Sequence, residues 1–163
     1  MITNVNGIPT IFVDADSCPV KEEIVEMASA FSVKVLFCCN YHHNIHHKLT
    51  YGNWKYVDSG KEAADLYIMN HAEKGDVVIT QDIGLASTLL PKGVQVLSPR
   101  GVMFHEKDIQ TALDIRFLNA KARKRGVYGK GPKPFRTEDR ERFLLELTRI
   151  LSKFAGINQI SAE

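Results

Sequence analysis

The sequence has 163 residues, of which 44% are hydrophobic and 25% are charged, as is ordinary for a soluble globular protein. No stretch approaches the roughly 20 consecutive apolar residues that a membrane span needs, and "MITNVNGIP" at the start lacks the regions of a signal peptide. The three cysteines have no zinc-site spacing and fit a reducing compartment. We therefore expect a single cytoplasmic domain over 1–163, with no membrane contact.

The charge is distributed unevenly along the chain. The formal net charge is +2, but residues 1–118 carry −4 and residues 119–163 carry +6. An acidic body with a basic C-terminal part suits a protein that holds a cation at one place and a polyanion at another. On charge alone, a solvated basic helix face explains the pattern equally well.

Short apolar runs alternate with amphipathic stretches along the first hundred residues. Strands are predicted at 10–14, 33–39, 54–58, 76–80 and 94–98, and helices at 19–31, 61–74, 83–90, 106–126 and 137–156. This alternation predicts an α/β fold of three layers, α/β/α, around a mainly parallel sheet of about five strands, with C-terminal helices added.

The C-terminal residues 106–163 are predicted to form a basic helical part of the same domain. In its first helix Ile109, Leu113, Phe117 and Ala120 recur at helical spacing, which indicates that they share one face of the helix. The sequence leaves open whether the two C-terminal helices pack on the sheet or stand out as an arm.

Three acidic residues follow predicted strands directly. Asp14 and Asp16 end the first strand in "IFVDADSCPV", and Asp82 follows the fourth in "VITQDIGLA". The carboxyl ends of parallel strands share one edge of a sheet, where open α/β folds bind ligands. Asp82 and Asp16 could each be a helix N-cap instead, whereas an unpaired acid after "IFV" at Asp14 would be costly to bury.

Asp65 lies on the apolar face of its predicted helix. Its neighbours at helical spacing are Ile68, Met69 and Ala72, and a charge on such a face is uncommon unless it is partnered. Because this helix starts near the strand ends, Asp65 is expected to join the same acidic cluster. The alternative is an ion pair with Lys61 at the edge of the apolar stripe.

Four carboxylates at one site, Asp14, Asp16, Asp65 and Asp82, repel one another unless a cation lies among them. Ligands that are all oxygen suit Mg²⁺ or Mn²⁺. An ion held in this way can activate water and neutralise phosphate oxygens, which is the chemistry of phosphodiester hydrolysis. The four residues are therefore the predicted catalytic and metal-binding residues.

Several short pieces together resemble one protein family. "DADSCPVKEEI", "EAADLYI", "GDVVITQDIGLA", "RG" at 100–101 and "GPKPF…DR..F" at 131–143 look like the YaiI/YqxD family of bacterial proteins. That family is grouped with PIN-like nuclease domains, which are parallel α/β proteins with acidic residues at their strand ends and typically bind Mg²⁺ or Mn²⁺. By this resemblance the acidic positions are Asp14, Asp16, Asp65 and Asp82.

The segment "CCNYHHNIHHKLTYG" departs from the pattern expected for that family. Its histidines His42, His43, His46 and His47 have i,i+4 spacing, which on a helix could bind a transition metal. A polar loop over the cleft is favoured over a zinc site. Cys38 and Cys39 should point to opposite faces of their strand.

The basic C-terminal part is the predicted nucleic-acid-binding surface, with single-stranded RNA as the expected partner. Its candidate phosphate contacts are Lys121, Arg123, Lys124, Arg125, Lys130, Lys133 and Arg136. Tyr128 and Phe135 lie between them and could stack on bases, although such residues more often pack.

Three functions are compatible with these residues. The first is a Mg²⁺- or Mn²⁺-dependent phosphodiesterase, specifically a ribonuclease. The second is a phosphatase, because "IFVDADS" also resembles the first motif of haloacid-dehalogenase-like enzymes, in which the first Asp attacks phosphorus. Those enzymes also have a pair of acidic residues after a later strand. In this sequence only Asp82 stands at that place, so the match is poor. The third is a non-catalytic nucleic-acid-binding domain, and the sequence also leaves room for a homodimer.

Overall fold

The structure is a computed structural model that describes residues 7–40, 51–57, 62–129, 131 and 133–162, with 156–162 as helical backbone. The predicted strands and helices are all present, with ends within about three residues of the prediction except in α5, which was predicted to end at residue 156 and continues to Ala162. In chain order the elements are β1 (Thr10–Asp14), η1 (Ala15–Ser17), α1 (Lys21–Ala30), β2 (Lys34–Asn40), β3 (Asn53–Val57), α2 (Ala63–His71), β4 (Val77–Ile79), α3 (Ile83–Leu89), η3 (Leu90–Lys92), β5 (Gln95–Leu97), α4 (Glu106–Lys124) and α5 (Thr137–Ala162).

The sheet confirms the predicted α/β class. Its five strands lie in the order β3-β2-β1-β4-β5, and all four pairings are parallel. The chain builds outward from β1 to β3 and then returns to add β4 on the other side of β1. The order therefore reverses between β1 and β4, which is the position where open parallel sheets form ligand sites.

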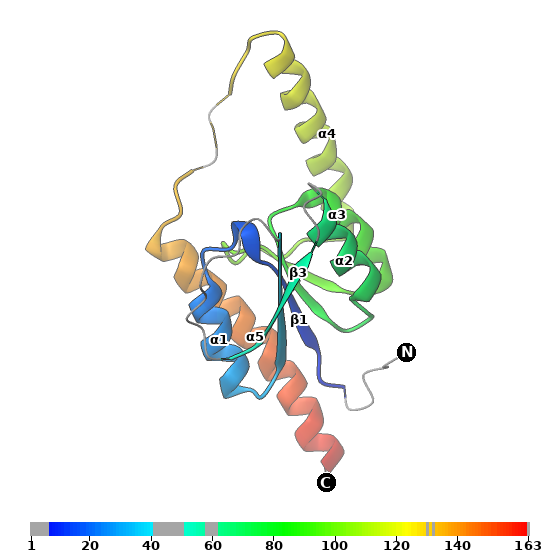
Figure 1. Ribbon diagram of the computed structural model, residues 1–163, viewed down its shortest axis with the longest axis vertical. Coiled ribbons are helices and arrows are strands. Elements are labelled where there is room, and N and C mark those ends of the chain that lie inside the picture. The colour runs from blue at the N-terminus through cyan, green and yellow to red at the C-terminus, as the bar shows by residue number, and fades with distance from the viewer. Residues whose placement is uncertain (1–6, 41–50, 58–61, 130, 132, 163) are drawn as a thin grey trace.

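Helices cover both faces of the sheet, so the predicted three layers are present (Figure 1). Ile11 and Val13 of β1 are fully buried against α1 and α5, while Phe12 between them faces α2, α3 and α4. Strands buried on both sides read as continuous apolar runs, which is why "TIFV" shows no polar alternation. Cys38 and Cys39 divide between the two faces in the same way, as predicted.

The two C-terminal helices behave differently. In α5, Phe143 and Leu147 are fully buried against α1 and the sheet. In α4 only the first half packs on the body, through Ile109 and Leu113. The second half extends beyond the sheet, and a chain segment returns from it to the start of α5 (Figure 1).

The apolar face expected for α4 is therefore covered in its first half and exposed in its second half. Phe117 has 67% of its surface exposed, and Leu118 has 61% exposed. Helical spacing identifies which residues share a face, but burial also needs a neighbouring element, and the described residues place none against this part of α4.

Candidate active site at the carboxyl edge of the sheet

Asp14 and Asp82 meet at the point where the strand order reverses. Asp14 is the last residue of β1, and Asp82 comes shortly after β4, the neighbouring strand. Thr80 connects them: its hydroxyl donates to Oδ2 of Asp14 at 3.0 Å and accepts the backbone N–H of Asp82 at 3.0 Å. The fold thus brings together two acids that are far apart in the sequence, as the strand pattern predicted.

Asp82 is also the N-cap of α3. Its Oδ1 accepts the backbone N–H groups of Gly84 at 2.8 Å and Leu85 at 3.3 Å. The capping alternative raised from the sequence is therefore correct, and it occurs together with the clustering of the acids. Capping fixes the Asp82 side chain in place, because one oxygen bonds two amides of a rigid helix turn.

Asp65 joins the same cluster from α2. It shares a side-chain hydrogen bond with Asp82, while Ile68 and Ala72 on the same helix face are buried in the core. Burial, the bond to Asp82 and the negative charges of Asp14, Asp82 and Glu62 raise the pKa of Asp65 to about 7. Asp65 can therefore hold a proton near neutral pH, because its ionisation would place another negative charge in the cluster.

Asp14 is half-buried. Burial raises the pKa of its carboxyl above the usual value, the bond from Thr80 opposes that rise, and the charges of Asp16 and Asp82 add to it. The direction of the shift shows that desolvation and like charge outweigh the single hydrogen bond. A cation beside Asp14 would favour its ionised form, as the sequence analysis expects.

Asp16 lies beside the cluster on η1 and is exposed. Its Oδ2 accepts the backbone N–H of Asn40, the last residue of β2, at 2.9 Å. Asp16 thus links the ends of two strands and acts on Asp14 through its charge. It does not cap α1, whose N-cap is Val20, so the capping alternative for this residue is wrong.

A cation from α4 also reaches this cluster. Nη1 of Arg116 lies 3.5 Å from Oδ1 of Asp82, and 60% of the Arg116 side chain is exposed. A shallow pocket of about 350 Å³ is lined by Asp14, Ser17, Gln81, Asp82, Ile83 and Arg116. Arg116 partly neutralises the cluster, but an exposed pair of this kind is weak and easily displaced.

The donor chemistry at this edge suits a hard divalent cation, since Asp14, Asp65 and Asp82 offer only carboxylate oxygens. In the described part of the chain, no three acidic, histidine or cysteine side chains lie in an arrangement that would hold a metal ion. The carboxylates instead bond to Thr80, to backbone amides and to one another. Metal binding stays a prediction that rests on the donor set.

The predicted nucleic-acid-binding residues fall into two groups. Lys121, Arg123, Lys124 and Arg125 are exposed at the end of α4, and Lys133 and Arg136 line a separate pocket before α5. Lys130 lies outside the described residues, as do the four histidines of 41–50. The structure thus places the basic residues at two locations, which the sequence did not distinguish.

Comparison with known sequences identifies the family. The sequence model described as "Uncharacterized BCR, YaiI/YqxD family" matches residues 12–153, a span that includes the acidic cluster and most of α5. The chain belongs to the YaiI/YqxD family. The resemblance seen in the short motifs is confirmed at this level.

Relatives in this family carry the name UPF0178 protein. One from Bacillus velezensis is 51% identical over 154 residues, covering 94% of this chain and 92% of the relative. Another from Bacillus cytotoxicus is 48% identical over 151 residues, covering 93% and 98%. These names assign no reaction, so the family membership does not by itself establish an activity.

Among solved structures, the crystal structure of Rae1 (YacP) from Bacillus subtilis, a W164L mutant, aligns with 92% of this chain and 99% of its own, at 14% identity and a TM-score of 0.40. A score of that size does not establish a common fold. The PIN-like assignment of this YaiI/YqxD family member stays a prediction. No helix in the described ranges combines the length and apolar character needed to cross a bilayer.

Two residues of the site, Thr80 and Arg116, were missed from the sequence. Thr80 immediately follows β4 and is buried, so its place two residues before Asp82 was the available signal. Arg116 lies three residues after Leu113 and seven after Ile109, on the face of α4 that turns toward the body. That spacing could have indicated a cation directed at the acids.

Proposed function

We propose that this protein is a Mg²⁺- or Mn²⁺-dependent phosphodiesterase that cleaves nucleic acid, with single-stranded RNA as its substrate. The observation that supports the proposal most strongly is the meeting of Asp14 and Asp82 at the switch point of a parallel sheet. Asp65 adds a third carboxyl to the same place. The family resemblance to PIN-like nucleases points in the same direction.

In this proposal Asp14, Asp82 and Asp65 hold the ion, and Asp16 binds it or orients the attacking water. The ion, when bound, supplies water activation and charge neutralisation on the phosphodiester. Thr80 and the start of α3 keep Asp14 and Asp82 in place before the substrate arrives. The basic residues of the C-terminal part hold the phosphate backbone.

The proton that Asp65 holds near neutral pH fits this role. Asp65 would be one of the residues that hold the ion, and a cation beside it would favour the ionised form of its carboxyl over the protonated form. The acids therefore do not all have to be ionised in the free protein. This explains how like charges can share one site without unfolding it.

The direct test is cleavage of a labelled single-stranded RNA by wild type and by Asp14→Asn. The substitution keeps an acceptor for Thr80 but removes the charge, so cleavage in Mn²⁺ should fall to the level of a blank without protein. Asp114→Asn is the matched control, because Asp114 is an exposed acid of α4 that bonds to Gln110. Equal cleavage by wild type and Asp14→Asn would identify a contaminating nuclease and contradict the proposal.

The two alternatives give different results in the same assay. A haloacid-dehalogenase-like phosphatase would accumulate a phosphoenzyme on Asp14 with a small phosphate ester. A non-catalytic binding domain would retain RNA equally well in wild type and in Asp14→Asn, with a steep dependence on salt and no cleavage.

A further inference from the structure

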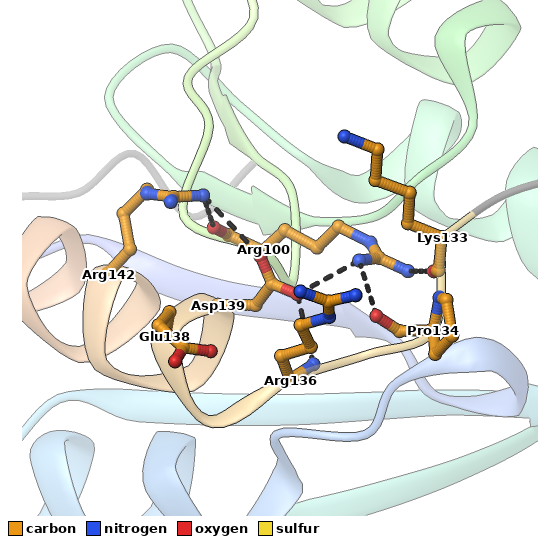
Figure 2. Close-up of a pocket in the computed structure, with 7 residues that line it drawn as sticks. All are labelled: Arg100, Lys133, Pro134, Arg136, Glu138, Asp139 and Arg142. Carbon is orange, nitrogen blue, oxygen red and sulfur yellow. Dashed lines mark hydrogen bonds and ion pairs between the residues drawn. The ribbon is translucent and has the colours of Figure 1, made fainter.

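A second pocket, rich in arginine, lies where the turn after β5 meets the start of α5. It has a volume of about 580 Å³ and is lined by Arg100, Lys133, Pro134, Arg136, Glu138, Asp139 and Arg142 (Figure 2). Four of these side chains are cationic and two are anionic, so the lining carries a net charge of +2. None of the acidic cluster residues lines it. The pocket is therefore a separate site with the opposite charge.

The pocket is held rigidly by contacts between distant segments. The Arg100 guanidinium donates to Oδ2 of Asp139 at 2.9 Å and to the backbone oxygens of Lys133 and Pro134 (Figure 2). Asp139 is largely buried and also accepts the backbone N–H of Arg136 at 3.0 Å. The main role of Arg100 is therefore structural, because its hydrogen bonds hold the loop before α5 against the turn that follows β5.

Phe135 anchors the same loop. Its ring packs against the core, with the guanidinium carbons of Arg100 and Arg140 at 5.6 Å and 5.1 Å from the ring centroid. Arg140 in turn bonds to Glu23 and to the backbone oxygen of Pro19, next to α1. The end of the loop that joins α5 is therefore fixed to the body, and Phe135 is a packing residue, which is the role that the sequence favoured.

The remaining cations of the pocket are available to a ligand. Within the described residues, no hydrogen bond or ion pair uses the Lys133 Nζ or the Arg136 guanidinium. Arg142 reaches Asp139 and the Arg100 backbone oxygen only at 3.5 and 3.4 Å, and it is half-exposed. Donors from three positions thus line one pocket, and cationic donors of this kind suit an anion with several oxygens.

The turn that carries Arg100 lies at the same edge of the sheet as the acidic cluster. Thr80, which bonds to Asp14, also donates its backbone N–H to the oxygen of Leu97 at 3.1 Å, and Leu97 ends β5. The turn that carries Arg100 begins at the next residue, Ser98, whose hydroxyl accepts the Val102 N–H at 3.1 Å. A strand lying along this edge would therefore pass both sites.

We propose that the pocket of Lys133, Arg136 and Arg142, fixed by Arg100 and Asp139, binds a backbone phosphate of a nucleic-acid strand. The proposal rests on the proposed function for the identity of the strand, since the scissile phosphodiester would lie at the acidic cluster. Among the described residues that line the pocket, none has an aromatic ring on which a base could stack. The pocket therefore binds the backbone of a nucleic acid of any base sequence. It also sets the distance between the bound phosphate and the bond that is cleaved.

The experiment measures binding without metal, so that it does not depend on cleavage. A labelled single-stranded RNA of about 12 nucleotides is titrated in EDTA at several salt concentrations with wild type, Lys133→Gln/Arg142→Gln and the control Lys107→Gln/Arg149→Gln. Each double variant loses one lysine and one arginine. The pocket variant should bind about tenfold more weakly, and its slope of log K against log salt should be shallower by about 1.4.

Equal affinity and equal slope in the two double variants would overturn the proposal. Lys133→Gln alone is a control for misfolding, because the Lys133 Nζ makes no hydrogen bond or ion pair within the described residues. This single variant should make the slope of log K against log salt shallower by about half the change seen in the double variant. In a competition assay, a nucleoside monophosphate is added at the same total phosphate concentration as the RNA. If it displaces the RNA, the pocket binds free nucleotides, and the proposal that it binds a phosphate of a strand is overturned. Because this assay needs neither metal nor cleavage, failed cleavage by the wild type and failed phosphate binding can be told apart.

Discussion

Asp65 and Asp82 share a hydrogen bond between their carboxyl groups, although one lies on α2 and the other caps α3. Such a bond requires a proton on one of the two acids. Burial and the surrounding negative charge raise the pKa of Asp65 to about 7, which favours a proton on that carboxyl near neutral pH. The net charge of the acidic cluster therefore changes with pH when Asp65 ionises.

Asp65→Asn should stabilise the metal-free protein above neutral pH. The pKa of Asp65 is higher in the folded state than in the unfolded chain, so its stabilising effect is complete below about pH 4 and is lost as the pH rises through about 7. Asparagine keeps the bond to Asp82 without the ionisation. At pH 8 the variant should gain roughly 1–2 kcal/mol, a figure reduced for solvent screening at a half-exposed site.

The measurement is urea unfolding at pH 5 and pH 8 in EDTA. Wild type should lose stability relative to Asp65→Asn between these two values. A constant difference between the two proteins across that range would show that Asp65 does not carry the proton.

Arg116→Gln should increase the affinity for Mn²⁺. Arg116 lies 3.5 Å from Asp82 and competes with any cation for that carboxylate. An exposed pair is worth at most about 1 kcal/mol, so the gain should be about two- to fivefold in titration calorimetry. Arg123→Gln, on the same helix and exposed, should leave the affinity unchanged. A lower affinity in Arg116→Gln would mean that Arg116 supports the cation site.

Gly101→Ala should destabilise the fold strongly. Gly101 has φ +82°, and an added Cβ would lie 2.6 Å from backbone atoms of Arg142 and Phe143 in α5. Gly126 is the matched control, because its φ is +81° but nothing lies within 4 Å of its added Cβ. Both variants incur the cost of the left-handed conformation, so the difference isolates the steric clash, which should be at least about 2 kcal/mol.

Thermal and urea unfolding of the two glycine variants test this prediction. Equal losses of stability would show that the turn at Gly101 can move away from α5. In that case the arginine pocket would not be rigid.

Phe117→Ala should change stability by less than about 0.5 kcal/mol, whereas Phe143→Ala should cost about 3–5 kcal/mol. The two residues are both phenylalanines on C-terminal helices, but Phe117 is 67% exposed and Phe143 is fully buried. Urea unfolding of both variants provides the comparison. A large loss in Phe117→Ala would show that the second half of α4 is covered in solution.

The sequence was sufficient for the sheet and for most of the acidic cluster, for a physical reason. Strand ends are local features, and the carboxyl ends of parallel strands share one edge, so Asp14 and Asp82 could be brought together without coordinates. Asp65 was found because a charge on an apolar helix face needs a partner.

The misses have an equally physical origin. The bond between Arg100 and Asp139 joins residues far apart in the chain, and it depends on where α5 begins to cross the sheet. The hydrophobic periodicity of the sequence does not show where that crossing lies. The exposure of Phe117 could not be predicted, because an apolar stripe shows which face could be buried but not how far the covering body extends.

The most direct test of the cation site is a crystal soaked in Mn²⁺ and measured for anomalous scattering. The account predicts a peak bounded by Asp14, Asp65 and Asp82 in wild type, with Arg116 turned away from Asp82. The peak should disappear in crystals of Asp14→Asn that are treated in the same way. A wild-type crystal with no peak at these carboxylates, or with its peak elsewhere, would contradict the central claim that this edge of the sheet holds a divalent ion.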